Sequence, residues 1–479
     1  MRPLGWRPKP GDVVVRRRRL AELRPVIIPL PLPHPARPGL SSPLTLAYGF
    51  GALLLVGTLL LLLPWANHQG GVTPWMTALF TAASAATVTG LTVVDTPTFW
   101  TPLGQGVILA LILIGGTGWM TLAGFLLMVL GARITLPHRL AFREALGSPA
   151  LGGIVRLLRN MVLTFLGIQL AAALLLGYLW RQGQGWEWPI ALWQGAFHAV
   201  SAFNNAGFTI LPNSSNFSAL HSSLGVLLLF AFLIILGGLS FPVLADLARV
   251  RRFSRLHLDT KMVLVGSALL WALGWAVFLA FEARNPDTMG PFPLGEKVVN
   301  ALFHSVSART AGFSTVEIGK VAPATAFFLT GLMFIGTASA STGGGIRLNT
   351  AGVLVATLLA SLRGRRHVTA FGREMGEDQV HRAIALAIIG LALVFFIAFF
   401  LTFTERVPFI NLLFDTVSGL GTVGLTMGEV PGLSPVGKGL IILTMLAGRI
   451  GPLALALALL QREGRPVLYR FAEERVRIG

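Results

Sequence analysis

The sequence predicts an all-α integral membrane protein made of four linked copies of one unit, each with a spanning helix, a re-entrant loop and a second spanning helix. Three observations lead to this fold. Hydrophobic residues make up 54% of the 479 residues and charged residues only 12%, which excludes an ordinary soluble protein. Basic residues are confined to segments between apolar stretches, and one short motif recurs four times. Eight spanning helices and four half-helices are therefore expected.

Several apolar stretches reach the roughly 20 residues that an α-helix needs to cross the hydrocarbon core of a bilayer. They include residues 44–65, 161–180, 262–281 and 383–404. The amino terminus does not read as a cleavable signal, because a proline-broken stretch follows the basic run at 16–19. The absence of cysteine excludes disulfides, thiol catalysis and cysteine-bound metals.

The basic residues predict topology and not nucleic-acid binding. The formal net charge is +18, but no recognition helix or aromatic RNA-binding strand accompanies the arginines. They gather at 133–159, 249–261, 363–382 and 462–477, between the apolar stretches. By the positive-inside rule these segments and the basic amino-terminal arm are cytoplasmic, so both termini are expected inside a cell (inner) membrane.

A phenylalanine followed four residues later by serine, and then by glycine, marks each unit. The four copies run from Phe80 to Leu91, Phe197 to Phe208, Phe303 to Phe313 and Phe414 to Leu425. They recur at intervals of roughly 110 residues, which suits two spanning helices and a re-entrant loop. The serine-to-glycine interval is six residues in three copies and five in the third. A second pattern of small residues recurs downstream at 114–116, 236–238, 335–337 and 446–448.

The segment 80–86 and its equivalents make only about two helical turns before a glycine, which predicts half-span helices. Non-helical backbone at membrane depth is tolerated only where it is buried in protein or lines a water-filled cavity. The four following strands are therefore expected to surround one pseudo-four-fold pore, where their carbonyl oxygens replace the water shell of a monovalent cation. Glycine permits the backbone angles this requires. The alternative is that the glycines serve only close helix packing.

These segments resemble the Trk/Ktr/HKT superfamily of potassium transporters, and are most similar to its KtrB-type bacterial membrane subunit. The resemblance covers roughly residues 43–460, and its most specific pieces are 87–91, 204–208, 309–313, 422–425 and 448–453. It implies four helix, pore-loop, helix (M1-P-M2) repeats with a potassium filter made of backbone carbonyls. The implied filter residues are Thr87, Val88, Thr89, Gly90, Asn204, Asn205, Ala206, Gly207, Arg309, Thr310, Ala311, Gly312, Gly421, Thr422, Val423 and Gly424.

The resemblance also implies a gate below the filter, in a flexible intramembrane loop at 336–350. Small and β-branched residues between Gly336 and Gly345 make a poor helix, which agrees with that role. The implied gating residues are Gly336, Ser341, Thr342, Gly343, Gly344, Gly345, Arg347 and Arg449.

Three polar groups within the apolar stretches need separate explanations. Arg449 stands in an apolar helix and is expected to face the cavity, repel cations and contribute to gating; a structural ion pair is the alternative. Arg347 could instead reach the cytoplasmic interface. His198, His304 and Asp415 share one repeat position, where a structural hydrogen-bonding role is favoured over ion coordination.

The expected organisation is an arm at 1–42, units at 43–132, 133–250, 251–366 and 367–460, and a cytosolic tail at 461–479. The resemblance implies potassium as the transported ion, sodium as a stimulating ion and no cofactor in this chain. It also implies a homodimer on a cytosolic KtrA-type ring of regulatory subunits, which would bind the nucleotide. The basic loops could meet that ring, although attraction to anionic membrane lipids explains the same charges.

Other function classes find less support. A membrane enzyme needs convergent catalytic groups, and the chain has no H-E-x-x-H motif and no paired carboxylates within the apolar stretches. A secondary transporter with inverted repeats would show two mirrored halves instead of four like-oriented units. A gated channel, a sodium-dependent transporter and a TrkH-like proton-coupled transporter all fit the residues.

Overall fold

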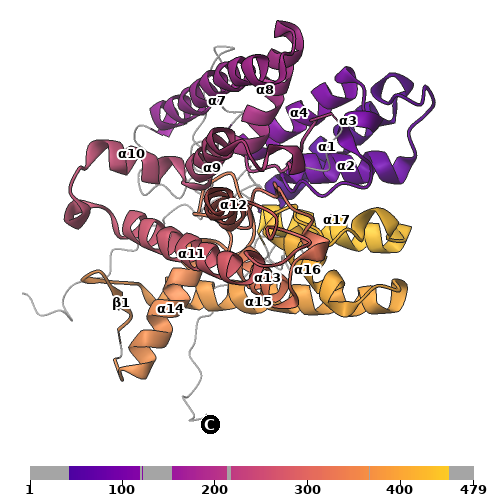
Figure 1. Cartoon of the computed structure of the whole chain (residues 1–479). Coiled ribbons are helices and arrows are strands. Elements are labelled where there is room, and N and C mark those ends of the chain that lie inside the picture. Colours follow the sequence, from indigo (N-terminus) through magenta and orange to yellow (C-terminus); the bar gives the residue numbers. More distant parts are fainter. Residues whose placement is uncertain (1–42, 119–120, 122–153, 213–216, 366, 452–479) are drawn as a thin grey trace, which may run out of the picture. The chain divides into compact units, whose positions relative to one another are not determined.

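Helices of very different length make up most of the described chain (Figure 1). The computed structural model describes residues 43–118, 121, 154–212, 217–365 and 367–451, which all lie in the unit Leu40–Gly479. The predicted arm at 1–42, the tail at 461–479 and most of the basic segment 133–159 lie outside the described residues.

Helices of different lengths follow one another along the chain. The α-helices are α1 (Pro43–Leu62), α2 (Trp75–Thr87), α3 (Thr96–Phe99), α4 (Pro102–Thr117), α7 (Ile154–Gln184), α8 (Trp188–Phe203), α9 (Leu224–Gly238), α10 (Phe241–Arg249), α11 (Leu258–Glu282), α12 (Leu294–Ser307), α13 (Pro323–Phe334), α14 (Leu348–Leu362), α15 (Glu377–Thr404), α16 (Phe409–Gly421) and α17 (Pro435–Ile450). The predicted spans at 161–180, 262–281 and 383–404 lie within α7, α11 and α15.

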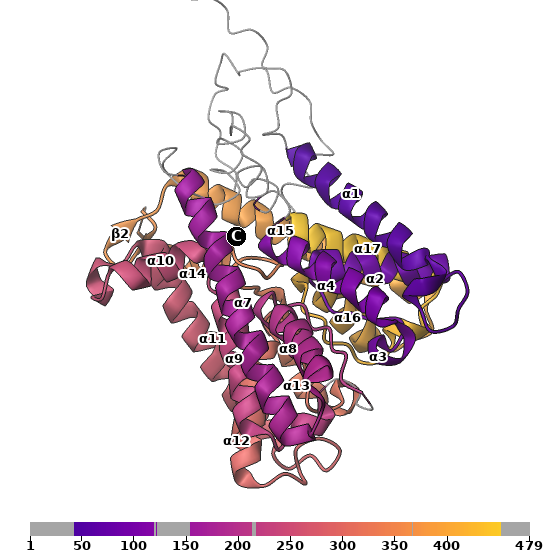
Figure 2. The same cartoon turned by 90° about the horizontal axis from the view of Figure 1, so that it is seen from above.

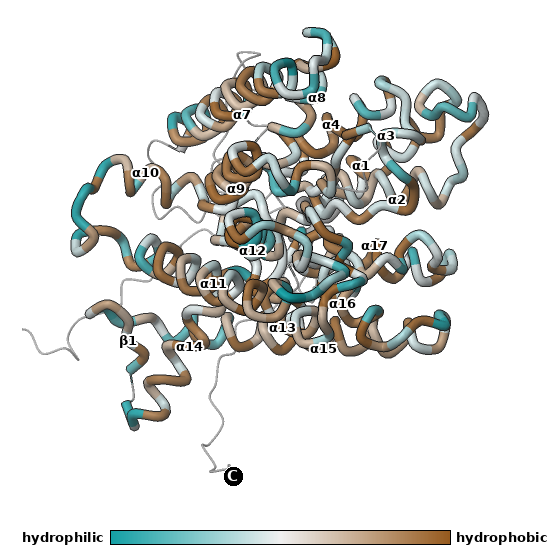
Figure 3. Tube along the Cα trace, in the orientation of Figure 1, coloured by the Kyte–Doolittle hydropathy of each residue, from teal (hydrophilic) through white to brown (hydrophobic). Residues whose placement is uncertain are grey.

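Three of the described helices are long and apolar enough to cross a membrane, namely α7, α11 and α15. A fourth span results if α9 and α10 are counted together, although the two helices meet at a bend of 97°. Pro242, in the first turn of α10, has no N–H to continue the ladder of α9, which accounts for the break. Figure 3 shows hydrophobic residues along α7, α9, α11 and α15. The protein is therefore a multi-pass membrane protein.

Four short helices, α2, α8, α12 and α16, carry the repeated motif at their carboxyl ends. They contain 13, 16, 14 and 13 residues, so each begins earlier than the predicted two turns. The reason is a proline at each start: Pro74, Pro293 and Pro408 directly precede three of them, and Pro189 is the second residue of α8. Proline suits the first turn, where its missing N–H costs nothing. This signal was present in the sequence.

The helices close into a cycle through contacts between neighbouring groups. The short helices pack within their own groups, for example α2 with α1 and α4, and α16 with α15 and α17. Each group also contacts the next short helix: α4 packs on α8, α9 on α12, α13 on α16, and α17 returns to α2. Figures 1 and 2 both show α17 beside α2, at opposite ends of the described chain. The segments after the short helices therefore meet inside this cycle.

One hairpin departs from the predicted all-α structure. Strands β1 (Thr369–Ala370) and β2 (Arg373–Glu374) pair antiparallel, with Thr369 opposite Glu374. Phe371 and Gly372 form the connection and both have positive φ, at 50° and 74°, as a two-residue type I′ turn requires. The sequence predicted only a basic loop in this segment.

Two buried or half-buried glutamates join the end of one long helix to the start of a later one. Glu282, at the end of α11, accepts hydrogen bonds from the N–H of Ala322 (2.9 Å) and the hydroxyl of Thr325 (2.5 Å) at the start of α13. Its other oxygen accepts from Asn285 and Thr288, both at 2.7 Å. Glu405 after α15 caps α17 in the same way, through the N–H (3.1 Å) and hydroxyl (2.5 Å) of Ser434.

We expect Glu282→Ala to lower the free energy of unfolding by about 2–4 kcal/mol, because it leaves several buried donors without an acceptor. Thermal unfolding of the purified protein in detergent measures this. Glu317→Ala is the matched control, since Glu317 forms only an exposed pair with Lys320 and its loss should change little. Equal shifts for the two variants would contradict the assigned role of Glu282.

Candidate functional site

The backbone segments that follow the four short helices meet in a closed ring. We call residues 87–91, 204–208, 309–313 and 421–425 the ring loops. Their glycines all have positive φ: 88° at Gly90, 70° at Gly207, 73° at Gly312 and 93° at Gly424. A Cβ at each would lie closer than 3.0 Å to a carbonyl oxygen of the next loop: Ala206 for Gly90, Ala311 for Gly207, Val423 for Gly312 and Thr89 for Gly424. Only glycine fits both the backbone angle and the space.

The serine of each motif fixes its ring loop to the short helix. The residue before each glycine donates its N–H to that serine's carbonyl: Thr89 to Ser84 (2.8 Å), Ala206 to Ser201 (2.7 Å), Ala311 to Ser307 (2.8 Å) and Val423 to Ser418 (2.9 Å). The hydroxyl groups add a second bond. Ser84 and Ser418 accept from the glycine N–H at 3.0 and 3.1 Å, whereas Ser201 and Ser307 donate to Phe208 and Phe313 carbonyls at 2.7 and 2.6 Å. The repeated spacing is thus a backbone-fixing device.

The third loop is shorter because it lacks one left-handed residue. In the other three loops Val88, Asn205 and Thr422 have φ of 59°, 58° and 48°, in the left-handed region. Such a conformation costs an L-residue about 1–2 kcal/mol. The third loop omits this residue yet keeps the N–H bond to its serine at 2.8 Å.

The predicted filter residues lie together in the ring loops, but the side chains of several of them bond to other elements. All are buried except Gly90, which is half-buried. Asn204 donates outward to Gln169 on α7 at 3.2 Å, and Arg309 donates to the Gly336 carbonyl at 2.7 Å. Asn205 and Thr310 share a side-chain hydrogen bond of 3.0 Å, which links two neighbouring ring loops.

The loop between α13 and α14 lies directly against the ring. It runs over 335–347, so it starts one residue earlier than predicted and ends three residues earlier, because Leu348 already begins α14. Ile335 and Ile346 pair across its base, and the Gly336 N–H donates to the Ile346 carbonyl at 2.8 Å. At its tip, a Cβ on Gly343 would lie 2.8 Å from Thr310 Cγ2. A Cβ on Gly344 would lie 2.6 Å from Thr422 Cγ2, so the tip contacts two ring loops.

Backbone and hydroxyl groups hold this α13–α14 loop to the surrounding helices. Thr342 donates its N–H (3.3 Å) and hydroxyl (2.9 Å) to the Gly237 carbonyl at the end of α9. The Gly345 N–H donates to the Gly448 carbonyl on α17 at 3.2 Å. The downstream small-residue pattern thus supplies the acceptors for the loop.

Arg449 connects the same loop to the end of α4. Its guanidinium donates to the carbonyls of Thr342 and Gly343 (3.3 Å to the latter), and to those of Gly115 and Gly116 (3.2 Å to the latter). Helix-end carbonyls carry partial negative charge, which favours a cation there. All of these acceptors are carbonyls, and Arg449 forms no ion pair with the described residues. Arg347 also donates to the Gly343 carbonyl, a contact within the same loop.

The three polar residues at the shared repeat position make the expected structural hydrogen bonds. His198 Nδ1 donates to the Gln194 carbonyl (2.9 Å) and His304 Nδ1 to the Asn300 carbonyl (2.8 Å). Their Nε2 atoms bond Thr209 (2.9 Å) and Ser314 (3.0 Å), and Asp415 accepts from the Met427 N–H (3.0 Å). Each residue therefore ties a short helix to the segment after its ring loop. Within the described ranges no group of three His, Cys, Asp or Glu residues could hold a metal.

A cavity of about 340 Å³ adjoins the ring at Gly424. It is lined by Gly424 and by residues that follow two ring glycines, including Ser314, Glu317, Thr426 and Met427. Glu317 lies 2.6 Å from Lys320, and this hydrogen bond and charge raise the pKa of the Lys320 ammonium. The ring thus borders both a cavity with a carboxylate in its lining and a loop held by arginines.

Comparison with known proteins places the chain in a family. Residues 53–463 match the family described as TrkH, cation transport protein. The chain belongs to the TrkH family of cation transport proteins. This membership confirms the resemblance found in the sequence. It also confirms that the chain is a transport protein and not a membrane enzyme.

Relatives within the TrkH family match over nearly their whole length. The Ktr system potassium uptake protein B of Bacillus subtilis (strain 168) is 41% identical over 429 residues, which cover 90% of this chain and 95% of that protein. The potassium/sodium uptake protein NtpJ of Enterococcus hirae is 35% identical over 448 residues, 92% of this chain and 98% of that protein. The crystal structure of the potassium transporter TrkH from Vibrio parahaemolyticus shares the fold, with a TM-score of 0.67 at 18% identity, covering 89% and 85% of the two chains.

We expect Arg449→Gln to speed amide hydrogen exchange in the 335–347 peptide about tenfold or more, because charged hydrogen bonds contribute about 1.5–3 kcal/mol each. Hydrogen exchange with mass spectrometry on the purified protein measures this. Arg284→Gln, an exposed arginine after α11, is the control and should leave the peptide unchanged. Unchanged protection in Arg449→Gln would show that Arg449 does not hold the loop.

Proposed function

We propose that this TrkH-family chain takes up potassium ions across the cell membrane through the ring of four glycines. The supporting observation is the ring itself, in which four loops of one motif each set a positive-φ glycine against the carbonyl of the next loop. Such loops can present backbone carbonyls in place of an ion's water shell. The names of the relatives above, which are potassium or potassium/sodium uptake proteins, agree with this proposal.

The proposed architecture is four M1-P-M2 units at 43–132, 133–250, 251–366 and 367–460, with eight spanning helices and four half-helices. The cyclic contacts of α4 with α8, α9 with α12, α13 with α16 and α17 with α2 support it. The carboxyl ends of the four short helices point their partial negative charge toward the ring loops, which favours a cation. By the positive-inside rule, the basic segments support a cell (inner) membrane protein with both termini in the cytoplasm.

In this proposal the α13–α14 loop is the gate, with the boundaries corrected to 335–347. Its tip touches Thr310 and Thr422, residues that precede ring glycines, so the described arrangement is the closed one. Opening then requires the loop to leave its acceptors at Gly237 and Gly448 and its donor Arg449. A homodimer and a cytosolic KtrA-type nucleotide-binding ring would drive this motion. Sodium fits as a second ion, since NtpJ is named for both.

We expect Gly312→Ser to lower potassium uptake or its preference over sodium at least about tenfold, because the left-handed backbone alone costs an L-residue about 1–2 kcal/mol. The added group would also meet the Val423 carbonyl. Rubidium uptake, in a bacterial strain without its own potassium systems and supplied with the regulatory subunit, measures this. Gly331→Ser is the matched control, because a Cβ there meets nothing within 4 Å. A well-expressed parent that moves no potassium would refute the proposed pore.

We expect Arg449→Gln to raise ion flux about tenfold, since a charge about 10 Å away at an effective dielectric constant near 20 repels a cation by about 1.7 kcal/mol. Loss of the loop tether acts in the same direction. Flux into proteoliposomes, with Arg284→Gln as the charge-matched control, measures this. Reduced or unchanged flux would show that Arg449 is not part of the proposed gate. The proposed filter would be unaffected by this result.

A further inference from the structure

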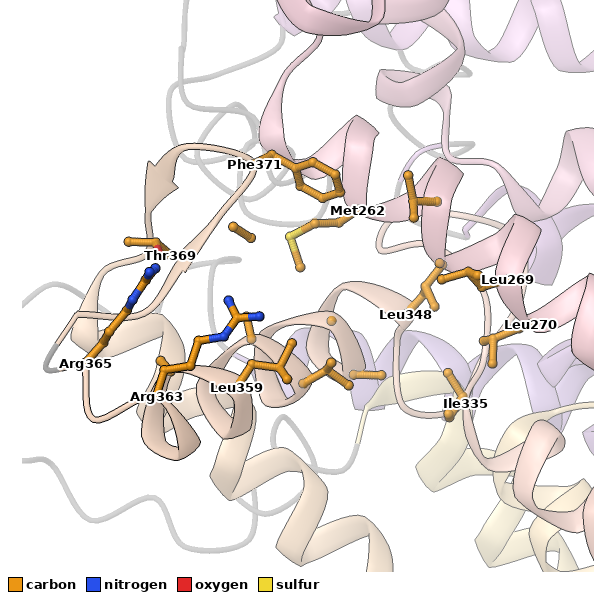
Figure 4. Close-up of a pocket in the computed structure, with 18 residues that line it drawn as sticks. Met262, Leu269, Leu270, Ile335, Leu348, Leu359, Arg363, Arg365, Thr369 and Phe371 are labelled. Carbon is orange, nitrogen blue, oxygen red and sulfur yellow. The ribbon is translucent and has the colours of Figure 1, made fainter.

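An apolar groove of about 550 Å³ lies between α11, α14 and the hairpin β1–β2, away from the ring. We call it the lateral groove. Figure 4 shows Arg363 and Arg365 at one end and Leu270, Ile335 and Leu348 at the other. Its volume falls within the range of about 300–1,000 Å³ that is typical of small-molecule sites. The lateral groove is thus polar at one end only.

Small residues create the space. Gly266 on α11 and Gly352, Ala356 and Ala360 on α14 line the groove. A Cβ on Gly352 would lie 2.5 Å from the terminal methyl group of Met262, so a larger residue here would occupy the groove. The walls are open along the exposed apolar surface of a membrane span, since Leu269 on α11 is 65% exposed and Val355 on α14 is 56% exposed. A lipid chain can therefore enter sideways from the bilayer.

The polar end carries positive charge without a paired acid. Arg363 and Arg365 are exposed, and neither forms an ion pair within the described ranges. The nearby hairpin acid, Glu374, is already paired with His367 at 2.8 Å. Phe371 of the hairpin contacts Phe253 edge-on with ring centroids 6.2 Å apart, and both rings are about half exposed, as is common at a membrane interface.

We propose that the lateral groove binds one anionic phospholipid. Its acyl chain lies against α11 and α14, and its phosphate lies at Arg363 and Arg365. The charge complementarity at one end and the apolar walls at the other select for an amphipathic anion, and basic pockets between spanning helices are known to suit such headgroups. General attraction of basic loops to the membrane involves no defined site, whereas this proposal assigns one lipid to one groove of limited size.

The bound lipid also acts on the base of the α13–α14 loop. Ile335 and Leu348 flank that loop, and both line the inner end of the groove. An occupied groove therefore fills the space between α11 and α14 beside the pairing of Ile335 with Ile346. Lipid binding should raise the thermal stability of the protein in the described arrangement. This inference does not depend on the proposed potassium pore, since binding is measured directly.

The test is lipid binding to the purified full chain by native mass spectrometry, with phosphatidylglycerol and phosphatidylcholine titrated separately. We expect the parent to prefer phosphatidylglycerol. The double variant Arg363→Gln/Arg365→Gln should lose about fivefold in phosphatidylglycerol affinity per arginine, the change that corresponds to ~1 kcal/mol for each charge. Its phosphatidylcholine affinity should stay the same. Arg373→Gln, on the neighbouring strand and outside the groove lining, is the charge control.

Gly352→Leu and Ala356→Leu fill the groove and should abolish the lipid-induced rise in the unfolding temperature. Gly167→Leu, at an exposed glycine of α7 with nothing within 4 Å of its Cβ position, should keep it. Two groove variants are used so that the test still works if one of them fails to fold. Gel filtration detects such a failure. Unchanged phosphatidylglycerol binding in both groove variants and in the arginine variant would overturn the proposal.

Two further experiments distinguish the lipid from other occupants of the lateral groove. Displacement of the lipid by glycerol 3-phosphate at equal concentration, with binding kept in Gly352→Leu, would mean a phosphate site without a chain and would overturn the proposal. Dissociation of an oligomer by Gly352→Leu without any change in lipid binding would mean that a second copy covers the groove, with the same consequence.

Discussion

The whole arrangement depends on backbone approaching backbone at four places. Each ring glycine lies so close to the carbonyl of the next loop that one methyl group would push the two apart. The contacts themselves are between backbone atoms, so their geometry depends on the structure that supports each loop. That support is the motif serine, whose carbonyl and hydroxyl hold each loop to its short helix. Three of the short helices in turn pack their carboxyl ends against glycines of a downstream helix, Ala86 on Gly115, Phe203 on Gly237 and Leu420 on Gly448.

The buried and half-buried arginines near the ring follow a consistent electrostatic pattern. Arg309, Arg347 and Arg449 all donate to carbonyl oxygens of the α13–α14 loop or of helix ends. A carbonyl partner compensates a cation less fully than a carboxylate does, so excess positive charge remains near the loop. The ring loops next to it offer the opposite, a set of backbone oxygens. Backbone oxygens at the ring and arginine charge at the loop are thus neighbouring features of the described chain.

Much of this could be predicted from the sequence because repetition supplies internal evidence. The four Phe-to-Ser-to-Gly copies located every ring loop, and the glycine-rich stretch located the α13–α14 loop to within three residues. The starts of the short helices were missed although Pro74, Pro293 and Pro408 mark three of them. Other features could not be predicted, because they depend on distant contacts. The acceptors of Arg449 lie more than a hundred residues away at Thr342 and farther still at Gly115, and no local pattern identifies them.

The closing contact of the ring joins Gly424 to Thr89, nearly opposite ends of the described chain. Contacts of such sequence separation form late, because the intervening chain must be ordered first. During synthesis the first three ring loops therefore exist before the fourth can complete the circle. A nascent or truncated chain that ends before α16 holds an open arc in place of a ring. A chain of that length therefore lacks the closed ring on which the proposed pore depends.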